Sequence, residues 1–147
     1  MEKQIKKSIE ITATKEKIWE VLLQDKFTRI WYAEFSEGTY AETDWKLESK
    51  VVFKDATNCG LIGKIVVNRP FEVISVEYTG ILTNGIEDTK SSDAKSMSGG
   101  RETYRLTEIG TNTTQLNIEC DMAEEYFGMM SAAWDKALEK IKNLSEN

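Results

Sequence analysis

Apolar residues recur at steps of three and four positions along residues 121–147, which predicts one long helix with a single buried face. The residues on this face are Phe127, Met130, Trp134, Ala137, Leu138, Ile141 and Leu144. Asp121, followed three residues later by Glu124, is typical of a helix N-terminus. A helix of roughly 22 residues is about 33 Å long, the length of a strand of about ten residues. We therefore expect this helix to pack against a sheet.

Apolar and polar residues alternate over much of the remaining chain, which predicts strands with one buried face. The alternating apolar rows are Ile5, Ile9 and Ile11; Trp45, Leu47, Val51 and Phe53; Leu61, Gly63, Ile65 and Val67; Ile74, Val76 and Tyr78; Tyr104 and Leu106; and Leu116, Ile118 and Cys120. One polar face is typical of an antiparallel sheet that is covered on one side only. We expect roughly seven strands, with the last helix as their cover.

Two short helices are predicted directly after the first strand. Thr14 is a suitable N-cap for a helix over residues 15–24, with Ile18, Val21 and Leu22 on its apolar face. The spacing of apolar residues favours a second helix over residues 27–32.

The chain has the length of one domain, so we expect residues 1–147 to form a single domain. Residues 86–100 are polar and rich in serine and glycine, and they follow the hairpin signal Asn84-Gly85. We predict that this segment is a flexible hairpin loop. It is either a disordered hairpin tip or a mobile flap over a cavity.

Charge and composition exclude several classes of function. The formal net charge is −6 and the longest basic run is the pair Lys6-Lys7, so binding of nucleic acid is disfavoured. No apolar run is long enough to span a membrane, and the first residues lack the apolar core of a signal peptide. We expect a soluble cytoplasmic protein without membrane insertion, in which Cys59 and Cys120 are reduced, buried thiols.

The sequence contains no histidine. Histidine is the usual general base at neutral pH and the commonest metal ligand, so Ser-His triads, His-Cys nucleophiles and most zinc sites are excluded. Any chemistry must use carboxylates, tyrosines or lysines. We expect no metal and no cofactor.

Three stretches of the chain carry a resemblance to a known superfamily. They are residues 9–14 (IEITAT) running into residues 18–22 (IWEVL), residues 29–32 (RIWY), and Ala133-Trp134 followed by Leu138 and Ile141. With these motifs the sequence resembles the START-like, or SRPBCC, helix-grip superfamily, and within it the bacterial branch akin to the C-terminal domain of the activator of the heat-shock chaperone ATPase. Residues 47–50 (LESK) lack the glycine pair that is common in that branch.

The resemblance implies an α+β fold, in which a bent seven-stranded antiparallel sheet wraps a long C-terminal helix and two short helices follow the first strand. It also implies a cavity between the sheet and the N-terminal half of the last helix. Tyr126, Phe127, Met130 and Trp134 would form the helix wall, Phe53, Ile65, Tyr78 and Tyr104 the sheet wall, and Trp31 and Phe35 the mouth.

Such a cavity would bind a small hydrophobic or amphipathic molecule, lipids included. The alternative is that the same side chains simply fill the core. Gly128, unusual inside a helix, would either give room for a ligand or permit a harmless kink.

Two other functions are open. Glu102 is in phase with Tyr104 on its strand, and burial could raise its pKa enough for acid–base catalysis, as in the cyclase or aromatase relatives of the superfamily. Arg69, Arg101 and Tyr78 could supply hydrogen-bond donors for such a reaction. The resemblance to the chaperone activator implies a protein-interaction module with a chaperone or another protein as its partner.

Overall fold

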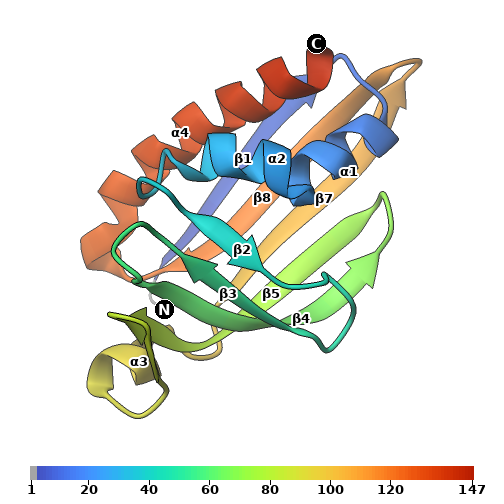
Figure 1. Ribbon diagram of the computed structural model, residues 1–147. Helices are drawn as coiled ribbons and strands as arrows, with labels where there is room; N and C mark the ends of the chain where they lie inside the picture. Colours follow the sequence, from blue (N-terminus) through green and yellow to red (C-terminus); the bar gives the residue numbers. More distant parts are fainter. Residues whose placement is uncertain (1–2) are drawn as a thin grey trace.

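The computed structural model describes residues 3–147, which form one bent antiparallel sheet and four helices (Figure 1). The elements are β1 (Lys3–Ile11), α1 (Lys15–Leu23), α2 (Asp25–Tyr32), β2 (Tyr40–Glu42), β3 (Lys50–Lys54), β4 (Gly60–Arg69), β5 (Val73–Thr83), β6 (Ile86–Asp88), α3 (Ser92–Met97), β7 (Arg101–Gly110), β8 (Thr113–Met122) and α4 (Glu124–Glu146). The strand order is β1-β8-β7-β5-β4-β3-β2, and β6 pairs with β5. The predicted helix-grip architecture is confirmed, with β6 as an additional short strand.

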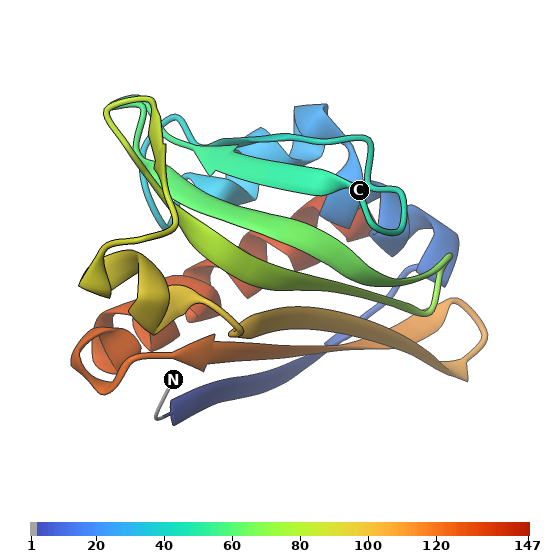
Figure 2. The ribbon, with the colours of Figure 1, turned by 90° about the horizontal axis from the view of Figure 1, so that it is seen from below.

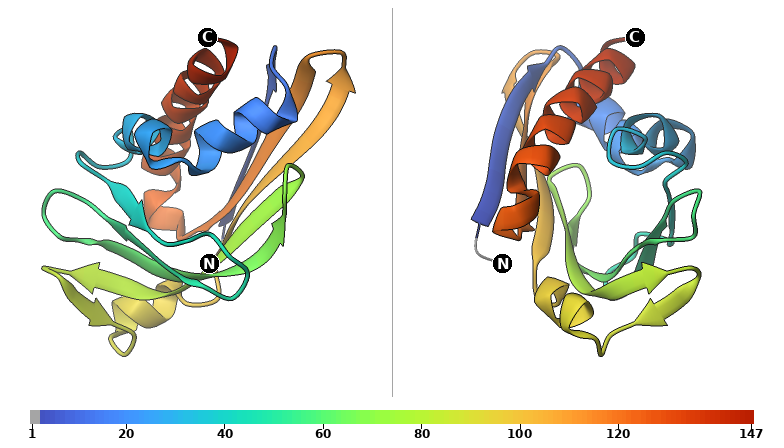
Figure 3. Two further views of the ribbon diagram at one scale, coloured as in Figure 1. Left: turned by 45° about the vertical axis from the view of Figure 1, so that its right-hand side comes forward. Right: turned by 90° about the vertical axis from the view of Figure 1, so that its left-hand side faces the viewer.

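The sheet curls around the helices. In the right-hand panel of Figure 3, the sheet runs from β1 beside α4 round to β2, which lies below α2. Register shifts between β4 and β5, at Ile62/Gly63 and Ile65/Val67, contribute to this bend because a bulge bends its strand. Gly63 is required at the first shift, since a Cβ there would lie 2.9 Å from the carbonyl oxygen of Glu77.

The helices all cover the same face of the main sheet except for α3, which lies at its end (Figure 2). Thr14 caps α1 as predicted, its hydroxyl accepting a hydrogen bond from the backbone N–H of Lys17 at 3.2 Å. α4 contacts β1, α1 and α2. Its C-terminal half is buried through Trp134, Ala137, Leu138 and Ile141. Its N-terminal half is not, since Tyr126 is 48% exposed and Met129 65% exposed.

The predicted N-terminus of the last helix is wrong. Asp121 belongs to β8, which continues to Met122 because Met122 still pairs with Lys3 of β1. The Asp121 carboxylate accepts hydrogen bonds from the backbone N–H of Arg101 at 2.9 Å and from the Gln4 side chain at 3.1 Å. α4 begins at Glu124, and its N-cap residue makes no side-chain capping bond.

The predicted strand through Trp45 and Leu47 is also wrong. Both residues lie in the turn between β2 and β3, where Trp45 and Glu48 have positive φ angles of 62° and 74°. Trp45 is partly buried beneath α1, and its indole N–H donates to the carbonyl oxygen of Leu23 at 3.0 Å. Its apolar character therefore reflects contact with a helix rather than membership of a strand.

Residues 86–100 contain secondary structure that the sequence pattern did not reveal. They include β6 and the short helix α3, whose N-cap Ser91 accepts a hydrogen bond from the backbone N–H of Ala94 at 3.1 Å. The helix was missed because Ala94 is its one buried residue, so no apolar periodicity marks it. The mobility of the segment stays a prediction, as does the assignment of residues 1–147 to one domain.

Replacing Gly128 with alanine should stabilise the protein. Gly128 lies in the interior of α4, is exposed, and has no atom within 4 Å of the position that a Cβ would occupy. Alanine costs less backbone entropy than glycine in a helix, so we expect the free energy of unfolding to rise by about 0.5–1 kcal/mol. Urea denaturation of both proteins measures this difference. A less stable Gly128→Ala variant would mean that the glycine is needed for the shape of α4.

Candidate ligand-binding cavity

A cavity of about 420 Å³ lies between the concave sheet, α2, α3 and the N-terminal half of α4. It forms here because α4 is straight and the sheet is bent, so the two diverge where the α4 side chains become exposed. Eight residues that the sequence places at a ligand site line this cavity: Trp31, Phe35, Phe53, Tyr78, Tyr104, Tyr126, Met130 and Trp134. Their contact with a ligand stays a prediction.

The other two sequence-predicted residues lie outside the cavity. Ile65 is fully buried within the hydrophobic core. Phe127 packs against the core beside β1, and the Lys3 ammonium lies 4.9 Å from the centre of its ring. Phe127 is displaced because successive helical residues point about 100° apart, so Tyr126 and Met130, four residues apart, share the face toward the cavity and Phe127 does not.

Several lining residues were not predicted from the sequence. They are Tyr32, Ser36, Thr39, Asp55, Cys59, Gly60, Leu61, Ile81, Asp93, Ser96, Met97, Met122, Glu125 and Met129. Most of the polar ones come from loops and from α3, where no periodic pattern exists to find them. Leu61 and Ile81, which pair across β4 and β5, are apolar strand residues, a pattern that predicts a strand but not a place in the cavity wall.

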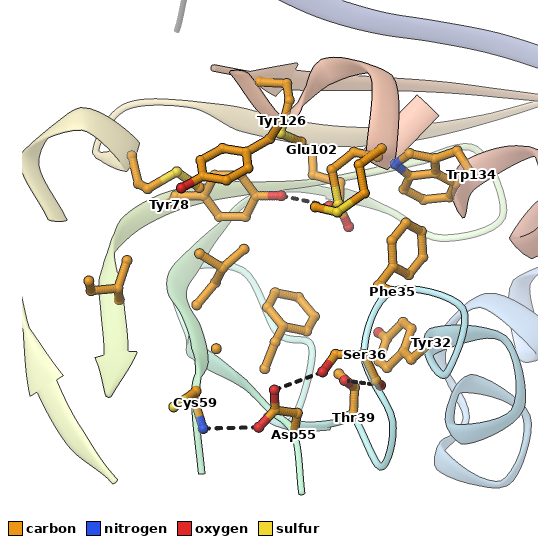
Figure 4. Close-up of a pocket in the computed structure, with 18 of the residues that line it drawn as sticks. Tyr32, Phe35, Ser36, Thr39, Asp55, Cys59, Tyr78, Glu102, Tyr126 and Trp134 are labelled. Atoms are coloured by element: carbon orange, nitrogen blue, oxygen red, sulfur yellow. Dashed lines mark hydrogen bonds between the residues drawn. The ribbon is translucent and has the colours of Figure 1, made fainter. Parts of the chain in front are cut away.

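Glu102 lies on the cavity wall within a cluster of hydroxyl and thiol groups. The Tyr78 hydroxyl donates to one carboxylate oxygen at 2.6 Å, and the Tyr104 hydroxyl donates to the other. The Cys120 thiol lies 3.7 Å from the first oxygen. Pairing of β5, β7 and β8 sets this geometry, because Glu102 is opposite Cys120 on β8. Figure 4 shows the Tyr78 hydroxyl directed at Glu102.

The surroundings shift the pKa of every group in this cluster. Burial raises the pKa of Glu102, while the hydrogen bonds from Tyr104, Tyr78 and Cys120 oppose that shift. Burial also raises the pKa values of Tyr78 and Tyr104 well above their usual range, and the neighbouring Glu102 charge adds to the effect. Both tyrosines therefore remain protonated donors to the Glu102 carboxyl group.

Aromatic rings form the wall next to this cluster. Trp134 lies edge-on to Tyr104 and to Phe35, with ring centroids 5.8 Å and 4.8 Å away. Trp31 contacts Trp134 at 6.1 Å, and its indole N–H donates to the carbonyl oxygen of Val21 at 2.9 Å. The ring of Tyr32 lies 4.5 Å from that of Trp31. These edge-on and tilted contacts are favourable arrangements for aromatic pairs.

A second polar group, Asp55, lies elsewhere on the wall (Figure 4). Its carboxylate accepts hydrogen bonds from the hydroxyl of Thr57 at 2.6 Å, the hydroxyl of Ser36 at 2.8 Å and the backbone N–H of Cys59 at 3.1 Å. These bonds, led by that from Thr57, lower the pKa of Asp55 to about 2 against the opposing effect of burial. Asp55 therefore stays ionised and fixes the turn that leads into β4.

Both cysteines are free: Cys120 is buried, whereas Cys59 is only half-buried and lines the cavity. Among residues 3–147, no group of three histidine, cysteine or acidic side chains could hold a metal ion. Within the same range, no helix is long and apolar enough to cross a membrane.

Known structures share this fold. Protein MLL2253 from Mesorhizobium loti matches with a TM-score of 0.75 at 16% identity, over 97% of this chain and 96% of that one. The structure of the Aha1 dimer from Colwellia psychrerythraea matches with a TM-score of 0.73 at 17% identity, over 98% and 96%. CalU16 from Micromonospora echinospora matches with a TM-score of 0.68 at 14% identity, over 96% and 74%.

At these identities the likeness establishes the fold alone. The chain has the START-like helix-grip fold, and its predicted resemblance to Aha1-like proteins is confirmed at that level. No protein-family model and no curated protein matches the sequence.

Replacing Glu102 with glutamine should alter how stability depends on pH. Because burial raises the pKa of Glu102 above its ordinary value of 4.5, the folded protein holds this proton more tightly than the unfolded chain does. The free energy of unfolding should therefore fall as pH rises from below 4.5 through the raised pKa. Glu102→Gln removes this contribution and leaves all other titrating groups in place.

Urea denaturation of both proteins at a series of pH values measures the effect. We expect the wild-type protein to lose stability relative to Glu102→Gln between acidic and neutral pH. A difference between the two proteins that stays constant with pH would show that Glu102 titrates normally.

Proposed function

We propose that this protein binds a small hydrophobic or amphipathic molecule in the cavity between the sheet and α4. The observation that carries the proposal is the cavity itself, about 420 Å³ in volume and lined mainly by aromatic and aliphatic side chains. Sites for small molecules are concave, mostly apolar and supplied with a few polar groups that fix orientation. Glu102, the tyrosines that donate to it, and Asp55 supply those groups here.

Two features favour a ligand site over a filled core. The two walls carry flexible methionines, Met97 on α3 and Met129 and Met130 on α4, which adapt to ligands of different shape. Tyr126 and Met129 are also exposed although they belong to the wall, so this end of the cavity is not packed as a core would be.

Catalysis is a second candidate function, favoured by the cluster at Glu102. A carboxyl group with a raised pKa, held by two tyrosines on the cavity wall, has the properties of a general acid or base. A cyclase- or aromatase-like reaction would act on a ligand bound in this same cavity. Ligand binding is therefore the step that both functions share.

A protein-interaction role is the remaining alternative, and the likeness in fold to Aha1 supports it. Binding of a chaperone or another protein through the acidic surface would weaken with salt and with surface charge substitutions, whereas ligand binding would depend on residues of the cavity. The expected cytoplasmic location stays a prediction.

Filling the cavity tests the proposal. Ile81 of β5 lines the cavity, and Ile81→Trp would place a large ring inside it. Ile109 of β7 is 47% exposed and lies outside the cavity, so Ile109→Trp is the matched control. We expect the uncharged dye Nile red to bind the wild type and the control with equal affinity, and Ile81→Trp at least about 10-fold more weakly.

Fluorescence titration gives the three dissociation constants, and circular dichroism verifies that each variant is folded. Equal binding by Ile81→Trp and the wild type would place the dye elsewhere on the protein and contradict the proposal. Absence of dye binding would be followed by native mass spectrometry with fatty acids, sterols, flavonoids and polyketide-like aromatics, and failure of all of them would overturn it.

A further inference from the structure

Trp134 carries a buried hydrogen-bond donor that has no acceptor. The side chain is 1% exposed, and its indole N–H has no hydrogen-bond partner within residues 3–147. A buried donor without a partner costs about 1–3 kcal/mol, so native structures rarely retain one without a reason. Trp134 lines the cavity, and Figure 4 shows its nitrogen on the edge of the ring that faces Glu102.

Two other tryptophans of the core, Trp31 and Trp45, satisfy this group. The indole N–H of Trp31 donates to Val21 at 2.9 Å, and that of Trp45 donates to Leu23 at 3.0 Å. The unsatisfied state of Trp134 is therefore not a general feature of how this protein buries indoles. Trp31 and Trp134 both line the cavity, and only the indole N–H of Trp134 lacks an acceptor among the described residues.

An acceptor with spare capacity lies close to Trp134. The Glu102 carboxylate accepts hydrogen bonds from Tyr78, Tyr104 and the Cys120 thiol, whereas a carboxylate has about four acceptor positions. Tyr104 joins the two groups, because its hydroxyl donates to Glu102 and its ring lies 5.8 Å from that of Trp134. This wall thus offers a ligand one free donor and one carboxylate acceptor.

The charges of the cavity limit the ligand further. Its ionisable carboxyl groups are Asp55, Asp93, Glu102 and Glu125, and none of the described residues that line it is a lysine or an arginine. A ligand carboxylate would lose its hydration without gaining a positive partner and would be repelled by these groups. A hydroxyl group meets neither difficulty, because it is uncharged and both accepts and donates.

We propose that the cavity selects apolar molecules that carry a hydroxyl group and rejects the corresponding carboxylates, with the ligand hydroxyl accepting from the Trp134 indole N–H and donating to the Glu102 carboxylate. This inference rests on the proposed ligand-binding function and narrows its ligand class to alcohols and phenols. Fatty acids and other apolar anions are excluded as ligands.

Three compounds of similar shape test separately whether the cavity binds apolar molecules and whether it prefers those with a hydroxyl group. They are 2-naphthol, 2-methylnaphthalene, in which a methyl group replaces the hydroxyl, and 2-naphthoate. We expect 2-naphthol to bind at least about 10-fold more tightly than either of the others, as expected for a hydrogen bond to a charged group. Equal or tighter binding of 2-methylnaphthalene or 2-naphthoate would overturn the hydroxyl assignment and leave the cavity function standing. No binding by any of the three would count against both.

The indole resonances of the ¹⁵N-labelled protein report the contact directly. On addition of 2-naphthol, the Trp134 indole proton should move downfield, as expected when a free N–H gains an acceptor, and 2-methylnaphthalene should not cause this shift. Trp31 and Trp45, whose indoles already donate to carbonyl oxygens, are internal controls. An unmoved Trp134 signal in the 2-naphthol complex would refute its role.

Glu102→Gln tests the acceptor. Glutamine keeps the shape of the side chain and removes the charge. The variant should bind 2-naphthol about 10-fold more weakly and 2-methylnaphthalene as the wild type does, which also shows that the cavity is intact. A parallel loss for both compounds would mean that Glu102 only supports the shape of the cavity. If the variant does not fold, the comparison of the three compounds on the wild-type protein still decides the proposal.

Discussion

The contact between Trp31, Tyr104 and Trp134 holds together the three parts of this fold, because each ring comes from a different element. Trp31 belongs to α2 and its indole is bound to α1, Tyr104 belongs to β7, and Trp134 belongs to α4. On one side of the contact, α4 continues into a closed core. On the other side it leaves the sheet and the cavity begins. The same three rings therefore end the core and form the wall of the site.

Glu102 is the costly element of that wall. A carboxylate in an apolar environment disfavours folding unless hydrogen bonds compensate for lost hydration, and here two tyrosines and a thiol surround it. An apolar side chain of similar size would stabilise the fold as well as this cluster does. Residues that lower the stability of the fold are expected mainly at functional sites. The indole of Trp134, whose N–H lacks an acceptor among the described residues, is a second such residue on the same wall as Glu102.

Periodic burial explains how much of the structure could be predicted. β1, α1 and α4 each bury one regular face, so Ile5 and Ile11, Ile18 and Val21, and Trp134 and Ile141 mark them in the sequence. Asp121 was misplaced because an acidic residue before a helix suits both an N-cap and a strand end, and pairing with β1 decides between them. In the cavity, Asp55 and Ser36 escaped detection since their hydrogen bonds join loops that only the tertiary structure brings together.

The segment of residues 86–100 contains structure that the sequence did not predict, and it also lines the cavity. Its helix α3 contributes Asp93, Ser96 and Met97 to the cavity wall, and Ala94 is its one buried residue. A segment with few buried apolar contacts opens at a lower free energy than the core does. The polar composition that hid α3 from sequence analysis thus belongs to a segment that forms part of the cavity wall.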